Sequence, residues 1–136
     1  TPQMRQALQD FYGNYSSEEE TGQTIHDLYE KTGYVIDTHT GVASAVYQQY
    51  KKNTGDETKT VIASTASPYK FSRSVMEAIS DEKLPEDEFA VIDELCRVSG
   101  VEIPKAVEEI RNAQIRHKLE CDVQDMKKTV AKILGI

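Results

Sequence analysis

Two short β-prone runs on either side of a helical pattern constrain the fold of this chain more than any other feature. Residues 34–36 (Tyr-Val-Ile) and 60–65 (Thr-Val-Ile-Ala-Ser-Thr) have the composition of strands. Between them, apolar residues recur at helical spacing over residues 42–50. A strand, a helix and a second strand in this order predict a right-handed parallel βαβ unit, so we expect an α/β fold.

The rest of the chain is predicted to be helical, which leaves the sheet small. Two parallel strands with several flanking helices would have two open edges, whereas parallel sheets are normally larger and covered on both faces. We therefore expect residues 1–136 to be a single domain that forms part of a larger doubly wound sheet. Residues 1–80 would hold the βαβ part and residues 81–136 a helical tail. The open edges would favour self-association.

Composition excludes several classes of function. The chain has 23 acidic and 16 basic residues, a formal net charge of -7, and no basic stripe of the kind that binds nucleic acid. No apolar run approaches the roughly 20 residues that a membrane-spanning helix needs. The two cysteines lie far apart and lack metal-ligand spacing, which favours free thiols in the cytoplasm over a disulfide framework.

The predicted strands direct attention to two loops. In open α/β sheets, ligands bind beyond the carboxyl ends of the strands. Here these ends lead into residues 37–41 and 64–71, and parallel pairing would bring both loops to one edge of the sheet. Each loop contains an ionisable side chain, His39 in the first and Lys70 in the second. A histidine at a helix start and an ordinary surface lysine are the simpler interpretations of these two residues.

Two hydroxyl residues, Ser64 and Thr65, close the second predicted strand. A small hydroxyl at such a position can form a hydrogen bond with a heterocyclic nitrogen without charging it. The alternative is that both hydroxyls simply satisfy nearby backbone groups.

At these loops the sequence resembles a known family. Residues 33–43 (GYVIDTHTGVA) resemble the Gly-Tyr-x-x-Asp-Pro-His-Thr-Ala-Val segment of threonine synthases. Residues 64–71 (STASPYKF) are similar to the Ser-Thr-Ala-His/Ser-Pro-Ala-Lys-Phe segment of the same family, in the same order and at a matching separation. Thr38 stands where the family has proline, and Gly41 where it has alanine.

This resemblance implies a fold and a reaction. Threonine synthases are pyridoxal-phosphate enzymes of the tryptophan-synthase-β-like fold, which convert O-phosphohomoserine and water to threonine and phosphate in the last step of threonine biosynthesis. By resemblance, Thr65, or Ser64 in its place, would form a hydrogen bond with the pyridine nitrogen of pyridoxal phosphate. Lys70 and His39 would contact the substrate, with Lys70 placed for its phosphate.

The family's catalytic machinery has no full counterpart in these 136 residues. Neither the lysine that forms a Schiff base with the cofactor nor a loop that cradles its phosphate is recognisable. The resemblance therefore implies a C-terminal fragment that is inactive alone and works with the missing N-terminal part of the enzyme. The alternative is a non-enzymatic α/β interaction module that presents an apolar helix surface to a partner.

Overall fold

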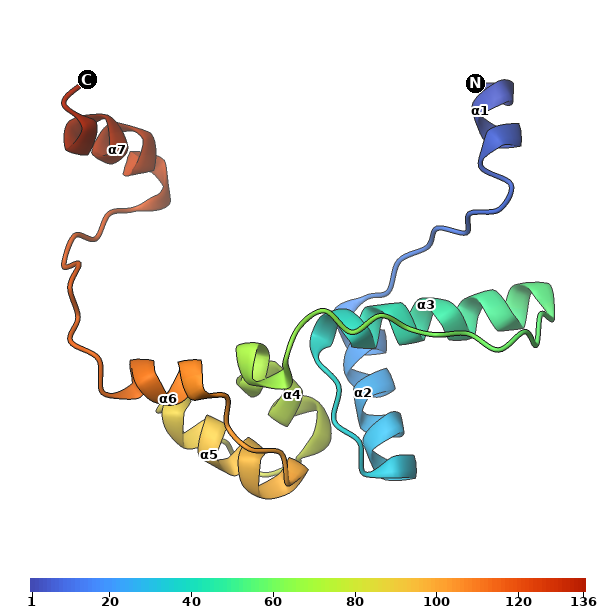
Figure 1. Cartoon of the computed structure of the whole chain (residues 1–136), viewed down its shortest axis with the longest axis horizontal. Helices are drawn as coiled ribbons and strands as arrows, with labels where there is room; N and C mark the ends of the chain where they lie inside the picture. The colour runs from blue at the N-terminus through green and yellow to red at the C-terminus, as the bar shows by residue number, and fades with distance from the viewer.

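Helices joined by turns and extended segments make up the whole chain in the computed structural model, which describes residues 1–136 (Figure 1). Helices α2 to α6 form a packed body, and α1 and α7 lie away from it at the two ends. The elements are α1 Pro2–Ala7, α2 Glu18–Thr32, α3 Thr38–Thr54, η1 Pro68–Phe71, α4 Ser72–Ile79, α5 Glu88–Ser99, α6 Lys105–Arg111, η2 Val123–Asp125 and α7 Met126–Leu134.

The structure has no strands, so the predicted α/β fold is wrong. Residues 34–36 and 60–65 form no strand, and no backbone hydrogen bond joins one to the other. Val35 and Ile36 are buried against helices, whereas Val61 is 95% exposed. Strand preference is largely a preference for packing on a sheet, and nothing in this chain offers the second run such a surface. The βαβ unit, the larger sheet and its open edges are all absent, so sheet edges provide no route to self-association.

The helix boundaries follow the local sequence closely. Ser17 and Glu20 form a capping box at the start of α2, with three acidic residues in its first turn. Gly33 and Gly55 end α2 and α3 in the left-handed conformation, both with φ of 70°. α1 ends at Ala7, although apolar residues at helical spacing continue to Tyr12.

The core lies where α2, α4 and α5 pack against one another, with α3 across α2. α4 and α5 are in contact across the expected boundary between residues 80 and 81. α3 approaches α2 closely at Gly41, where an added Cβ would lie 2.9 Å from Cγ1 of Ile25. The largest apolar side chains that are completely enclosed are Ile25, Met76, Leu95, Val75 and Val91.

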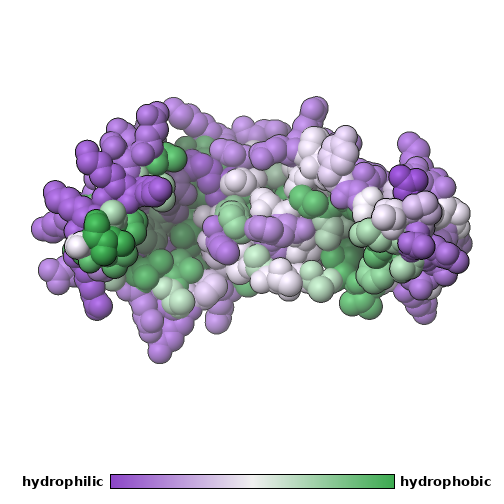
Figure 2. All heavy atoms as spheres, turned by 90° about the horizontal axis from the view of Figure 1, so that it is seen from above, coloured by the Kyte–Doolittle hydropathy of each residue, from purple (hydrophilic) through white to green (hydrophobic).

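The two ends of the chain contribute nothing to this core. Neither α1 nor α7 contains a buried residue. Hydrophobic side chains are visible on the surface towards both ends of the molecule (Figure 2). None of the helices combines the length and apolar character that crossing a bilayer requires.

Candidate functional site

Asp37 is the residue on which the candidate site is built. It is the N-cap of α3, and its Oδ1 accepts hydrogen bonds from the backbone N–H groups of His39 (2.9 Å) and Thr40 (3.4 Å). The same oxygen lies 3.2 Å from Nδ1 of His39. The Asp37 side chain is fully buried, so nearly all of its hydrogen bonding is to protein.

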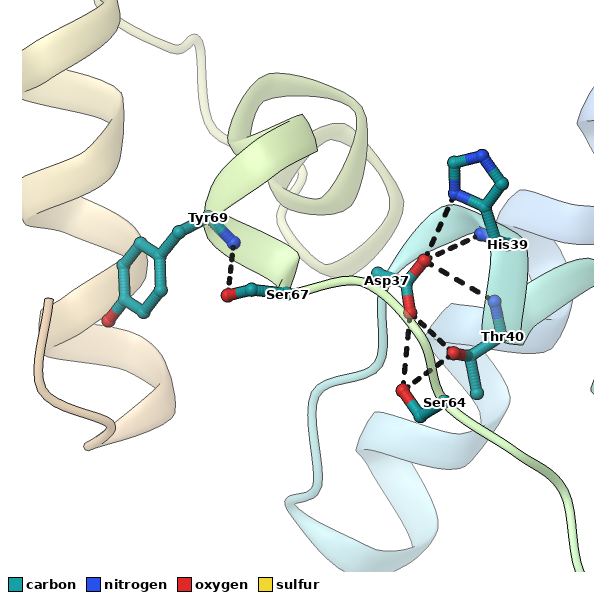
Figure 3. A network of polar contacts seen from close by, with 6 residues as sticks. All are labelled: Asp37, His39, Thr40, Ser64, Ser67 and Tyr69. Carbon is teal, nitrogen blue, oxygen red and sulfur yellow. Dashed lines mark hydrogen bonds and ion pairs between the residues drawn. The ribbon is translucent and has the colours of Figure 1, made fainter. Parts of the chain in front are cut away.

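The second carboxylate oxygen of Asp37 connects α3 to the loop that precedes η1 (Figure 3). Oδ2 accepts hydrogen bonds from the hydroxyls of Thr40 and, at 3.4 Å, of Ser64. The Thr40 and Ser64 hydroxyl oxygens are themselves 2.8 Å apart. The two loops singled out from the sequence therefore meet, although no sheet brings them together.

The hydrogen bonds to Asp37 determine its charge. Burial raises the pKa of this carboxyl, but the hydrogen bonds from the Thr40 hydroxyl and from the Thr40 and His39 backbone hold the pKa below its ordinary value of 3.8. Asp37 is therefore a carboxylate at neutral pH, and it can only accept hydrogen bonds.

The aromatic ring of Phe71 brings His39 and Lys70 into one neighbourhood. The imidazole of His39 packs on this ring with centroids 4.9 Å apart and an interplanar angle of 52°. Nζ of Lys70 lies 5.4 Å from the centroid of the same ring. Both side chains remain accessible, since His39 and Lys70 are exposed residues.

Ser64 and Thr65 differ in the state of their hydroxyls. Ser64 shares hydrogen bonds with Thr40 and Asp37. Thr65 is exposed, and its hydroxyl makes no hydrogen bond within the chain. Of these two neighbours, only Thr65 has a hydroxyl that is free for a ligand.

A cavity of about 540 Å³ opens beside His39. It lies between the first turns of α2 and α3 and the exposed side of α4, and its lining includes His39, Phe71, Glu18 and Glu77. No lysine or arginine lines it, and Ser64, Thr65 and Lys70 lie outside its lining. The cavity therefore suits a neutral or hydrogen-bond-donating group better than a phosphate.

Sequence reasoning overlooked part of this arrangement. Glu18 and Glu77 were not expected at the site from the sequence, yet both line the cavity. No sequence signal could have placed Glu77 there, because its position depends on how α4 packs on α2. The role of Asp37 had a local signal, since aspartate is a preferred N-cap residue and a helical pattern follows it.

A single side chain, Thr65, meets the requirement that the resemblance places on this chain for pyridoxal phosphate. The free hydroxyl of Thr65 is suited to a pyridine nitrogen, but neither Thr65 nor any lysine lines the cavity. No group of three or more His, Cys, Asp or Glu side chains in the chain is arranged to hold a metal ion.

Comparison with known proteins identifies the family. The family described as "Threonine synthase, C-terminal" matches residues 40–130, which is more than half of the chain. The human protein "Threonine synthase-like 1" is 33% identical over 78 residues, covering 57% of this chain and 10% of the human one. "Threonine synthase" of Schizosaccharomyces pombe is 36% identical over 78 residues, covering 57% of this chain and 15% of the yeast one.

The chain therefore belongs to the threonine synthase family, and it matches the C-terminal region of that family. The resemblance to threonine synthases is thereby confirmed, and the matched residues 40–130 include the segment 64–71. The matched part spans only 10% to 15% of the length of these relatives. No solved structure gives a significant match.

Proposed function

We propose that this chain supplies one side of a pyridoxal-phosphate site within a longer threonine synthase polypeptide. That polypeptide would convert O-phosphohomoserine and water to threonine and phosphate. The observation that carries the proposal is the meeting of the two family segments, whose Thr40 and Ser64 hydroxyl oxygens are 2.8 Å apart. Family membership gives this meeting point its chemical meaning.

In this proposal Thr65 forms the hydrogen bond with the pyridine nitrogen of the cofactor. Its hydroxyl has no partner in the chain, whereas the Ser64 hydroxyl is already held by Thr40 and Asp37. When bound, pyridoxal phosphate supplies an electron sink for chemistry at the substrate carbons. A neutral hydroxyl partner leaves the ring nitrogen largely unprotonated, which tunes the strength of that sink.

Lys70 and His39 contact the substrate in this proposal. An ammonium group is a compact charge that binds phosphate well, which suits Lys70 to the phosphate of O-phosphohomoserine. His39 packs on the same Phe71 ring as Lys70, so both would approach one substrate molecule from neighbouring positions.

The remaining catalytic groups would come from the rest of the polypeptide. We place the Schiff-base lysine and the phosphate cradle there, so the 136-residue chain alone should release no phosphate. Residues 1–136 would act as one domain, which the packing of α4 on α5 supports. A cytoplasmic location is supported by Cys96 and Cys121, which are free thiols.

The direct test assays the longer polypeptide with pyridoxal phosphate for phosphate release from O-phosphohomoserine. Thr65→Val should lower kcat with little change in KM, because it alters the cofactor ring and not substrate binding. Lys70→Met should raise KM, because it removes a charge that contacts the substrate phosphate. Thr60→Val and Lys59→Met serve as matched controls on the same exposed segment. Wild-type kinetics in both Thr65→Val and Lys70→Met would overturn the proposal.

A further inference from the structure

The contact between Asp37 and His39 determines which nitrogen of the imidazole carries a proton. Nδ1 of His39 lies 3.2 Å from Oδ1 of Asp37. Asp37 is a carboxylate and has no hydrogen to donate, so Nδ1 must be the donor. In neutral imidazole only one nitrogen carries hydrogen, which leaves Nε2 as an acceptor.

The surroundings make this arrangement rigid on one side and open on the other. Asp37 is fully buried and held by four donors besides the imidazole, whereas the His39 side chain is 61% exposed. His39 lines the 540 Å³ cavity, and no protein group forms a hydrogen bond with its Nε2. An acceptor fixed in orientation therefore stands at the wall of a cavity that has no positive charge in its lining.

We propose that Asp37 is a positioning residue that holds His39 as the Nδ1–H tautomer, so that Nε2 accepts a hydrogen bond from a ligand in the cavity. Through its other oxygen, Asp37 also fixes Ser64 and hence the segment that continues into Thr65. The ligand group at His39 is then a donor, such as water or a protonated amine, and phosphate binds elsewhere. This inference deepens the proposed function and rests on it for the identity of the ligand.

The chain contains its own standards for testing the tautomer. Nδ1 of His26 lies 3.1 Å from the backbone carbonyl oxygen of Ala78, which can only accept, so His26 is also an Nδ1–H tautomer. His117 is exposed and makes no hydrogen bond. The three histidines therefore give one positive standard, one negative standard and the residue under test.

The experiment records two-bond ¹⁵N–¹H correlation spectra of the imidazole groups in this chain at a pH where the rings are neutral. Assignments come from His39→Gln and His117→Gln. In the wild type, His39 should match His26 and differ from the tautomer mixture of His117. If His39 shows the same mixture as His117, the proposal is overturned without any variant of Asp37.

Asp37→Ser then tests the cause. Serine keeps an N-cap acceptor for α3 but has neither a charge nor a second oxygen. The His39 signals should move towards the mixture of His117 while the His26 signals stay unchanged. Unchanged His39 signals in a folded Asp37→Ser protein would overturn the proposal. If that variant does not fold, Asp37→Asn replaces it. Its side-chain acceptor is neutral, so the fraction of His39 in the Nδ1–H form should be smaller than in the wild type. An unchanged fraction would count equally against the proposal.

A second readout links the tautomer to the reaction. In the longer polypeptide, Asp37→Ser and His39→Gln should each lower the rate of phosphate release, and the double variant should lose less than the two single losses combined. Additive losses would show that Asp37 does not act through His39. A wild-type polypeptide that releases no phosphate would remove the proposed function, whereas the tautomer result in the isolated chain would stand or fall separately.

Discussion

Gly41 shows how tightly a single position can be constrained. The glycine lies in α3, where alanine would normally stabilise the helix by about 1 kcal/mol. Its added Cβ would, however, lie 2.9 Å from Cγ1 of the buried Ile25 and 3.1 Å from Cγ2 of Thr21. Overpacking of this kind costs roughly 1–3 kcal/mol. Gly41→Ala should therefore lower the free energy of unfolding in urea by about 1 kcal/mol after the helix gain is subtracted.

Gly22 provides the matched control for this prediction. It also lies inside a helix, but nothing is within 4 Å of a Cβ added there. Gly22→Ala should raise the free energy of unfolding by about 0.5–1 kcal/mol, because only the helix preference acts. An increase in stability for both variants would show that α2 and α3 are less closely packed than the structure indicates.

The ionisation of Asp37 predicts a pH dependence of stability. Its pKa in the folded chain is below the ordinary value of 3.8, so the unfolded chain binds its proton more readily. The charged Asp37 therefore stabilises the folded chain above about pH 4. This contribution to the free energy of unfolding is lost as the pH falls through the lower pKa that Asp37 has in the folded chain. The difference in free energy of unfolding between wild type and Asp37→Asn should therefore be largest near neutral pH and shrink below about pH 4.

Asp56 offers a contrast for the same titration. Hydrogen bonds from Thr58 and Tyr50 lower its pKa to about 2. The difference in free energy of unfolding between wild type and Asp56→Asn should consequently persist to a lower pH. It should disappear only as the pH approaches 2. Measuring both variants by chemical denaturation across this range tests the two sites together. A wild-type to Asp37→Asn difference that stays constant below about pH 4 would contradict the assignment.

One arginine holds the connecting segment between α4 and α5, residues 80–87. Arg73 donates from Nε to Glu88 at 2.6 Å, and from Nη2 to the backbone carbonyl oxygens of Pro85 (2.9 Å) and Glu86 (3.1 Å). Its side chain is only 32% exposed. Arg73→Met should lower the free energy of unfolding by about 1–2 kcal/mol and speed amide exchange over residues 81–87.

Arg97 provides the matched control for Arg73 and this connecting segment. It pairs with Glu94 within the same helix, and its side chain is 69% exposed. Arg97→Met should therefore cost no more than about 0.5 kcal/mol and leave amide exchange in residues 81–87 unchanged. Equal effects of the two substitutions would mean that Arg73 acts only as a surface charge.

The helices of this chain were predictable because their signals are local. The capping box of Ser17 and Glu20 and the left-handed glycines Gly33 and Gly55 act within one turn of the helix that they delimit. The strands were not predictable in the same way. Residues 60–65 have strand composition, but a strand exists only when another strand pairs with it, and this chain supplies none.

The candidate site was predictable in part, for a different reason. The resemblance selected residues 37–41 and 64–71, and the structure brings these loops together through Asp37 and Ser64. The reason expected for their meeting was a shared sheet edge, whereas the observed reason is a buried carboxylate that accepts hydrogen bonds from both segments. Long-range hydrogen bonds of this kind have no periodicity in the sequence, so pattern analysis could not predict them.

Across the whole molecule, stability is concentrated between α2 and α6. The core cluster and the side chains packed on it lie within residues 25–107. Beyond α6, residues 112–136 contain no buried residue. Apolar residues such as Ile115, Val123 and Ile133 are at least 65% exposed in this stretch. The two ends should therefore open at far lower free energy than the body.

Limited proteolysis tests this division. Residues 113–122 form no helix and are exposed, so trypsin should cut early after Arg116 and Lys118, as it should after Arg5 and after Lys59 in the exposed segment that follows α3. Arg111 has the same cleavage chemistry but should resist, because it pairs with Asp93 at 2.6 Å and packs on the ring of Phe89. Mass spectrometry should find early products that end at Arg116 or Lys118. A deletion of residues 113–136 should leave the unfolding midpoint in urea unchanged, since no core contact is lost. Resistance at Arg116 and Lys118 equal to that at Arg111 would instead mean that α7 packs on the body or on a second copy of the chain in solution.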